Sequence, residues 1–104
     1  MELNIKPYLK AEDVIEGSVI EIKDEGSYQE REFKGEAKTV FEITANYNGV
    51  DYLYSMNPKT QVLWVKAFGK DTVKWIGKKG RSSIVQQNIY GQIKKVLYLV
   101  PIKE

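Results

Sequence analysis

The sequence predicts a single all-β domain that carries one helix. The chain has 104 residues, of which 42% are apolar and 12% aromatic, and this suits one folded domain with a modest core. Short runs rich in β-branched and aromatic residues recur along it, separated by turn dipeptides such as Asn48-Gly49. A longer segment after Asn57-Pro58 has the start and stop signals of a helix.

The first half of the chain is expected to contain three strands. Residues 18–23 alternate in polarity and form the first. Residues 24–38 are polar, contain two glycines and lack apolar periodicity, so a long connection is expected, which could extend as an irregular hairpin. Residues 39–47 and 50–56 form the second and third strands, because they alternate on either side of the hairpin signal Asn48-Gly49.

The helix is predicted from its two ends. Asn57 is a favoured N-cap residue and Pro58 a favoured first helical residue, while Gly69 is expected to end the helix. Asp71 begins a second short turn, which Gly77 ends. Trp64 and Phe68 are four residues apart and are expected to face the core, with Trp75 and Ile76 closing beside them.

The second half supplies two more strands, residues 82–87 and 93–100, joined across residues 88–92. The element order is therefore three strands, a helix and two strands. This is the order of the OB-fold, a five-stranded Greek-key barrel, here with its helix between strands three and four. An SH3-like barrel lacks that helix, and a ferredoxin-like fold needs two.

The sequence contains seven tyrosines, so it could present a surface on which the bases of a nucleic acid stack. A two-residue turn at Asn48-Gly49 pairs Ala45 with Tyr52 and Ile43 with Tyr54, on a nearly all-apolar face. This register favours a core or rim position for both tyrosines. The aromatic residues outside the expected strands, Tyr28, Phe33 and Tyr90, remain candidates for stacking, although a loop aromatic can also cover the barrel mouth.

The chain contains no cysteine and no histidine. Disulfides and thiolate metal sites are therefore excluded, and the commonest general base and metal ligand are missing. The neighbouring carboxylates at 12–13 and 24–25 point apart on a strand or loop. We expect no enzyme, no cofactor and no bound metal.

Two Gly-Lys pairs in residues 67–81 resemble part of a phosphate-binding loop. Such a loop needs G-x-x-x-x-G-K-[ST] before a helix. Gly69-Lys70 is followed by Asp71 and Gly77-Lys78 by Lys79, and both lack the first glycine. These glycines are therefore predicted to end helical turns.

Charge is unevenly divided along the sequence. Residues 1–52 contain six Lys and Arg against twelve Asp and Glu, whereas residues 53–104 contain ten against two. Such segregation is typical of a surface that faces a polyanion, or it can vanish as the chain folds. A turn at Tyr90-Gly91 would place Lys94 opposite Gln87 and Lys95 opposite Gln86, offering Gln and Lys together on one strand face. The alternative is a sheet edge kept soluble by lysines.

The segments "YLKAEDVIEGSVIEIKDEG", "AFGKDTVKWIGKKG" and "VQQNIYGQIKKVLYLVP" resemble small OB-fold proteins of archaea, phages and archaeal viruses. Those proteins are often described as candidate single-stranded DNA-binding proteins. The resemblance runs from about Tyr8 to Pro101 and implies the fold more than the function. It supplies no binding-site residues. The absence of Cys beside many Lys and Glu also suits a thermophilic source.

The sequence therefore predicts one OB-fold domain over residues 1–104, with residues 1–7 a flexible N-terminus. We expect it to bind single-stranded nucleic acid, DNA rather than RNA, with little sequence preference. The alternative is an OB-fold interaction module that joins another protein or itself through a sheet edge. No stretch approaches the ~20 apolar residues that span a bilayer and no signal peptide is evident, so a cytoplasmic protein is expected. The candidate binding residues are Tyr28, Phe33, Lys78, Lys79, Arg81, Gln87, Tyr90, Lys94 and Lys95.

Overall fold

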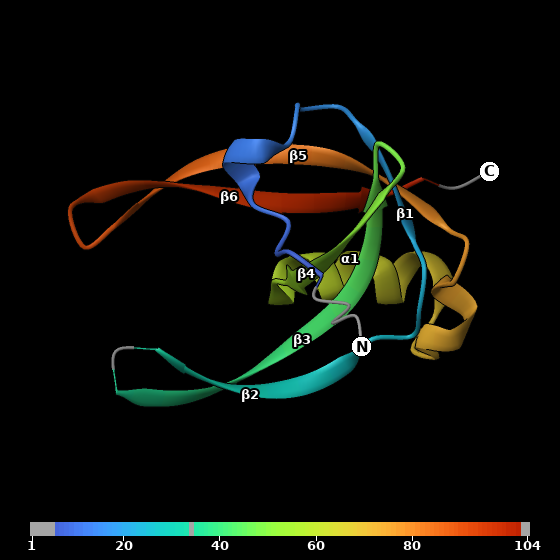
Figure 1. The fold of residues 1–104 in the computed structure, drawn as a ribbon, viewed down its shortest axis with the longest axis horizontal. Coiled ribbons are helices and arrows are strands. Elements are labelled where there is room, and N and C mark those ends of the chain that lie inside the picture. Colours follow the sequence, from blue (N-terminus) through green and yellow to red (C-terminus); the bar gives the residue numbers. More distant parts are fainter. Residues whose placement is uncertain (1–5, 34, 103–104) are drawn as a thin grey trace, which may run out of the picture.

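A computed structural model describes residues 6–33 and 35–102 (Figure 1). In these residues the chain forms six strands, one α-helix and two short 3-10 helices. The prediction of an all-β domain with one helix is confirmed. The elements are η1 (Ala11–Asp13), β1 (Val19–Ile22), β2 (Ser27–Phe33), β3 (Glu36–Tyr47), β4 (Val50–Met56), α1 (Pro58–Phe68), η2 (Thr72–Trp75), β5 (Lys79–Ile89) and β6 (Gln92–Pro101).

All six strands belong to one antiparallel sheet with the order β2-β3-β1-β5-β6, and β4 also pairs with β3. The strand that the sequence did not predict is β2, within the segment expected to be a long connection. It pairs with the first part of β3 from Phe33 opposite Glu36 to Ser27 opposite Glu42. No apolar alternation marks it because Glu30 and Glu32 face solvent.

The β3–β4 hairpin has the predicted register. Ala45 lies opposite Tyr52 and Ile43 opposite Tyr54, across a turn in which Asn48 has a φ of 52° and Gly49 a φ of 80°. Tyr54 is 2% exposed, and its hydroxyl donates to the carbonyl oxygen of Leu97 at 2.8 Å. Burial raises the pKa of Tyr54 to about 12. The tyrosines of this hairpin thus contribute to the core.

The ends of α1 are those that the sequence predicts. The Asn57 side chain accepts a hydrogen bond from the N–H of Thr60 at 2.9 Å, and Pro58 is the first helical residue. Gly69 follows the last turn with a φ of 90°, a conformation that favours glycine. The Asp71 side chain accepts from the N–H of Val73 and begins η2. Capping residues next to each helix therefore determine where α1 begins and ends and where η2 begins.

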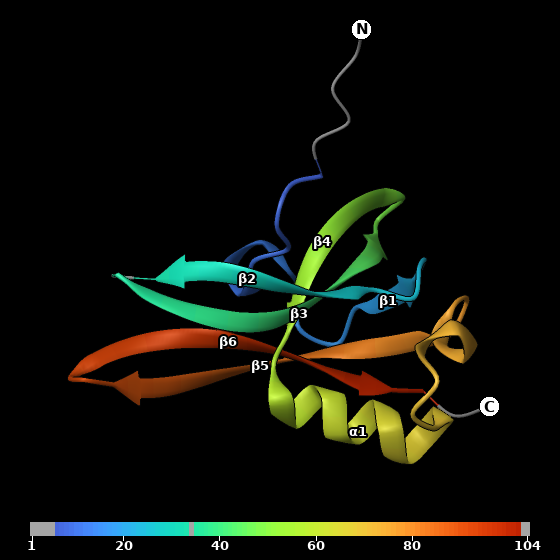
Figure 2. The ribbon, with the colours of Figure 1, turned by 90° about the horizontal axis from the view of Figure 1, so that it is seen from below.

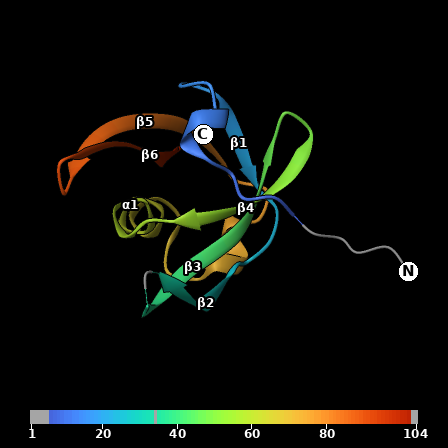
Figure 3. The same ribbon diagram turned by 60° about the vertical axis from the view of Figure 1, so that its left-hand side comes forward.

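The core lies between the sheet and α1, which runs along β6 (Figure 3). Trp64 is fully buried, and its indole N–H donates to the carbonyl oxygen of Leu99 at 2.9 Å. Its ring lies 5.2 Å from that of Phe68 and 5.6 Å from that of Trp75. The expectation that Ile76 also closes the core is wrong, since Ile76 is 48% exposed. Its extended backbone directs it away from the side on which Trp75 is buried.

The two longest hairpins, β2–β3 and β5–β6, extend beyond the core toward the same side of the molecule (Figures 1 and 2). At the end of the second, Tyr90 and Gly91 form the predicted two-residue turn, with φ values of 52° and 79°. In the part of the chain that the structure describes, no helix is long and apolar enough to cross a membrane.

Candidate nucleic-acid interface

The structure places the predicted cations and their neighbours in two groups at opposite ends of the β5–β6 hairpin. Lys79 begins β5 and Tyr90 lies in the turn after it, so the strand rise separates them by roughly 35 Å. One compact site cannot contain both groups. The first group is Lys78, Lys79 and Arg81; the second is Gln87, Tyr90, Lys94 and Lys95.

In the second group the predicted pairing is present, with Lys94 opposite Gln87 and Lys95 opposite Gln86. These two pairs lie on opposite faces of the hairpin, because successive residues of a strand alternate. One face of the hairpin therefore presents Gln87 with Lys94, and the other presents Gln86 with Lys95. The side-chain amide of Gln87 donates to the hydroxyl of Tyr98 at 2.6 Å, while Tyr90 is fully exposed.

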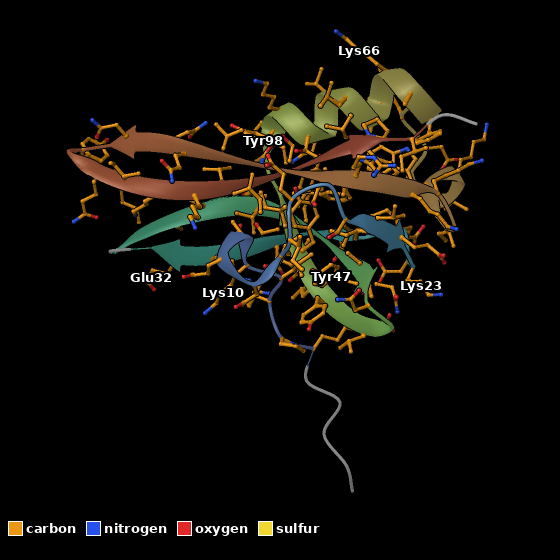
Figure 4. All side chains as sticks on the ribbon, turned by 90° about the horizontal axis from the view of Figure 1, so that it is seen from above. Lys10, Lys23, Glu32, Tyr47, Lys66 and Tyr98 are labelled. Atoms are coloured by element: carbon orange, nitrogen blue, oxygen red, sulfur yellow. The ribbon has the colours of Figure 1, made fainter. Side chains whose placement is uncertain are left out.

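The first group belongs to a larger basic region at the end of α1. Its cations are all exposed, and Lys66 projects from α1 into solvent (Figure 4). The ammonium group of Lys78 lies 5.6 Å from the ring centroid of Phe68, and the guanidinium of Arg81 donates to the carbonyl oxygen of Gly17 at 2.9 Å. We name this region the helix-end surface and define it by Lys66, Lys70, Lys74, Lys78, Lys79 and Arg81.

Glu21 of β1 lies opposite Lys79, but the basic half of the sequence itself supplies few carboxylates to the helix-end surface. Asp71 is the only one in residues 53–102, and it is used to begin η2. The ion pairs formed by the described residues are Lys23 with Glu21 and Arg31 with Glu42, so none of the six cations is paired with a carboxylate there. The candidate residues predicted from the sequence did not include Lys66, Lys70 or Lys74. The charge asymmetry was the signal for them, but their proximity depends on how α1, η2 and β5 follow one another.

The N-terminal segment of the same chain pairs with the edge of β4, and its Lys6 and Tyr8 side chains reach over the outer face of β3. The N–H of Leu53 donates to the carbonyl oxygen of Pro7 at 2.8 Å, and the N–H of Leu9 donates to that of Leu53 at 3.0 Å. The ammonium group of Lys6 donates to the hydroxyl of Thr44 at 2.9 Å. Of the segment expected to be flexible, residues 1–5 lie outside the described residues, whereas Lys6 and Pro7 are bound to the sheet.

Beneath this segment Glu42 is 4% exposed and forms a polar cluster. Arg31 donates to both carboxylate oxygens of Glu42, at 2.6 and 3.1 Å, and the Tyr8 hydroxyl donates at 2.8 Å. The hydrogen bond from Arg31 lowers the pKa of Glu42 and outweighs the opposing effect of burial. Burial also acts to raise the pKa of Asp24, but hydrogen bonds from Thr44 and Gly26 lower it overall.

Both lowered pKa values predict that stability falls in acid. A carboxyl group whose pKa is lower in the folded state stabilises the fold above its unfolded pKa, and this is lost as pH falls through the folded pKa. We expect the free energy of unfolding to decrease as pH falls from about 5 towards 3. In Glu42→Gln this decrease should be smaller, because one of the two groups no longer titrates. Urea unfolding at successive pH values measures it, and an unchanged acid slope in Glu42→Gln would contradict the assignment.

The two remaining predicted aromatic residues both lie on β2. Tyr28 is 69% exposed and lies opposite Phe41, with ring centroids 5.3 Å apart. Phe33 ends the strand opposite Glu36, and its side chain lies outside the described part of the structure. Tyr28 borders a cavity of about 380 Å³ between β2, α1 and η2. Lys70 also lines this cavity, which therefore adjoins the helix-end surface.

No protein-family model, curated protein or solved structure matches the chain. Among the described residues, no group of three or more Asp or Glu is arranged to hold a metal ion. The side chains placed at the interface are cations, aromatic rings and amide groups.

Proposed function

We propose that the protein binds single-stranded nucleic acid, DNA in the first place, with little sequence preference through the helix-end surface. The observation that carries this proposal is the group of six exposed cations with no carboxylate partner among the described residues. Cations that form no ion pair are free to replace the counterions of a phosphate backbone, which provides most of the affinity of sequence-independent binding. Backbone contacts of this kind read no base sequence.

An OB-fold is part of the proposal. β2 and β1 pair in turn with the first and last parts of β3, which supports regarding them as two halves of one long, bent strand. Counted in this way, the chain has five strands with α1 between the third and the fourth, as the OB-fold requires. Such a barrel would be joined between β4 and β6 by side chains, since Tyr54 and Asn57 both donate to the carbonyl oxygen of Leu97.

The proposed contact keeps Lys78, Lys79 and Arg81 from the residues that the sequence predicts, but it lies away from the usual OB-fold binding face. An OB-fold commonly binds oligonucleotides on the face of its second and third strands. Here that face would be the outer face of β3 and β4, over which the Lys6 and Tyr8 side chains reach and where the carboxylate of Glu42 would repel phosphate. At the helix-end surface the cations outnumber the neighbouring carboxylates, of which Glu21 lies opposite Lys79 and Glu25 lies near Lys70. Lys94 and Lys95 would then act, at most, as a second and weaker contact.

Two adjacent lysine pairs allow a matched test of this proposal. Lys78→Ala/Lys79→Ala should weaken binding of a labelled 20-nucleotide DNA strand by about tenfold or more at low salt. It should also lower the slope of log affinity against log salt by about 1.4, from roughly 0.7 per lost phosphate contact. Lys94→Ala/Lys95→Ala is the control, because it removes the same charge from the other end of the hairpin, and should change affinity less than threefold. Fluorescence anisotropy over a range of KCl concentrations measures both.

Three outcomes of that experiment would count against the proposal. Equal losses in the two double variants would contradict the helix-end location, and a larger loss in the Lys94/Lys95 variant would return the site to the hairpin. The absence of any salt-sensitive binding by the unchanged protein would contradict the function.

A specific observation also favours a second candidate, a protein-interaction module. The edge of β4 accepts an extended segment as a short parallel strand, here Pro7 to Leu9, with Tyr8 bridging to Leu53. Addition of a strand to a sheet edge is a common mode of peptide recognition. A tight oligomer in sedimentation, together with no binding of DNA by the same sample, would favour this candidate over the first.

A further inference from the structure

The cavity beside Tyr28 has aromatic walls. It lies between β2, α1 and η2, and its apolar lining consists of Tyr28, Phe41, Val65 and Trp75. Phe41 and Trp75 are buried in the core, 6% and 2% exposed, and their rings meet edge to face at 6.2 Å. Tyr28 is the exposed wall. We name this cavity the Tyr28 pocket; at about 380 Å³ it is within the size range of small-ligand sites.

Gly26 allows the backbone before β2 to pass close to Phe41, and this places Tyr28 beside the pocket. A side chain at residue 26 would meet the Phe41 ring at 2.7 Å and the carbonyl oxygen of Glu42 at 2.9 Å. Its φ of +69° is also one that L side chains rarely adopt. The link between β1 and β2 can therefore pass directly over Phe41, so that β2 begins at the mouth of the pocket.

The polar lining of the pocket is divided by charge. Gln61 and Thr72 lie on it with Lys70, which belongs to the helix-end surface, while Glu25 lies on the β1–β2 link and Ser27 begins β2. The amide nitrogen of Gln61 donates to the carbonyl oxygen of Met56 at 2.8 Å. This bond leaves the amide oxygen of Gln61 as an available acceptor. Phosphate is favoured on the Lys70 side and disfavoured near Glu25.

We propose that the Tyr28 pocket binds one base of a single strand whose phosphates lie along the helix-end surface. This inference rests on the proposed function. The base stacks on the ring of Tyr28, and an N–H of its edge donates to the amide oxygen of Gln61. Because adenine, cytosine, guanine and thymine each present at least one such N–H, the pocket adds affinity with little sequence preference. Lys70 binds the phosphate of the same nucleotide.

The test compares a strand that has bases with one that has none. The probes are a labelled 12-nucleotide oligo(dT) and a strand of equal length built from abasic sites, both measured by anisotropy with the full chain. Tyr28→Ala should weaken oligo(dT) binding by about 5- to 150-fold, the range for loss of one stacked base. It should change abasic binding less than twofold and leave the salt slope unaltered. Tyr28→Phe is the control, because it keeps the ring, and should remain within twofold of the unchanged protein for both probes.

The results separate this inference from the function on which it rests. If Lys78→Ala/Lys79→Ala weakens both probes but Tyr28→Ala weakens neither, or weakens both equally, the pocket proposal is overturned and the proposed function stands. If the unchanged protein binds neither probe, both are overturned. Tryptophan fluorescence gives a second readout that needs no variant, since Trp75 lines the pocket. Oligo(dT) should quench the emission and the abasic strand should not; equal quenching by both would also overturn the proposal.

Discussion

Replacing Trp64 with alanine is expected to lower the free energy of unfolding by roughly 3–5 kcal/mol, the range for loss of a fully buried large aromatic side chain. Trp64 is fully buried and contacts the rings of Phe68 and Trp75, so its removal leaves a cavity where α1 meets β6. It also leaves the carbonyl oxygen of Leu99 without the indole N–H that donates to it. Both effects act in the same direction, and together they are a large part of the 5–15 kcal/mol typical of a whole domain.

Urea unfolding followed by circular dichroism measures this loss. Val62→Ala is the matched control on the same helix, because Val62 is 52% exposed, and it should change the free energy of unfolding by no more than about 0.5 kcal/mol. Trp64→Phe keeps an aromatic ring but lacks the donor, so its loss should be intermediate. It gives a quantitative result even if Trp64→Ala does not fold. A loss below about 1 kcal/mol in Trp64→Ala would show that the helix does not pack as described.

Adding one methyl group at Gly80 is expected to cost about 1–3 kcal/mol, although alanine is otherwise the better strand residue. Gly80 lies in β5 and, unlike the other glycines of the described residues, has no positive φ, so glycine is required here for space. A Cβ atom at this position would lie 2.5 Å from Cγ of Leu99 and 2.9 Å from Cζ2 of Trp64. Both neighbours are buried and cannot move away without disturbing the core.

A double-mutant cycle with Leu99→Ala tests that explanation. Removing most of the Leu99 side chain makes room for the methyl group, so Gly80→Ala should cost less in the Leu99→Ala background than in the unchanged protein. We expect an interaction energy of at least about 1 kcal/mol in that direction. Additive losses would mean that the space around Gly80 is not limited by Leu99. Chemical unfolding of the four proteins supplies the required free energies.

The uneven charge of the sequence persists in the folded molecule. The basic second half contributes the helix-end surface, and the carboxylates of the first half, such as Glu30 and Glu32, lie on the β2–β3 hairpin. Folding intermixes the charges in part, since Glu21 of β1 lies opposite Lys79 and Glu25 lines the same cavity as Lys70. A chain with this division would approach a polyanion in a preferred orientation, which accelerates association at low salt.

Features decided within a few residues could be predicted from the sequence. Asn48-Gly49 fixes the register of β3 against β4, because its two residues adopt the positive φ values that a two-residue turn requires. Asn57 and Gly69 likewise mark the ends of α1 through a side-chain cap and a backbone conformation. In each case the physical cause lies in the residue itself or in its nearest neighbours.

The interface, in contrast, was decided by the tertiary structure. The strand β2 is polar on both faces and becomes a strand only because β3 is long enough to pair with it. Tyr28, assigned from sequence to a loop, lies on that strand and borders a pocket with Trp75, which is 47 residues away along the chain. Lys78 lies beside the last turn of α1, 5.6 Å from the ring of Phe68, because η2 turns the chain back to β5.

The sequence by itself therefore determined the turns, the caps, one hairpin register and the separation of charge between its halves. Only the tertiary structure decided which cations lie together, that the N-terminal segment pairs with β4 and reaches over β3, and that an aromatic pocket opens beside the basic surface. Turns and caps depend on local backbone energies, whereas these last features depend on contacts between segments distant along the chain. Leu53 with Pro7 and Phe41 with Trp75 are contacts of this kind, and no short stretch of sequence encodes them.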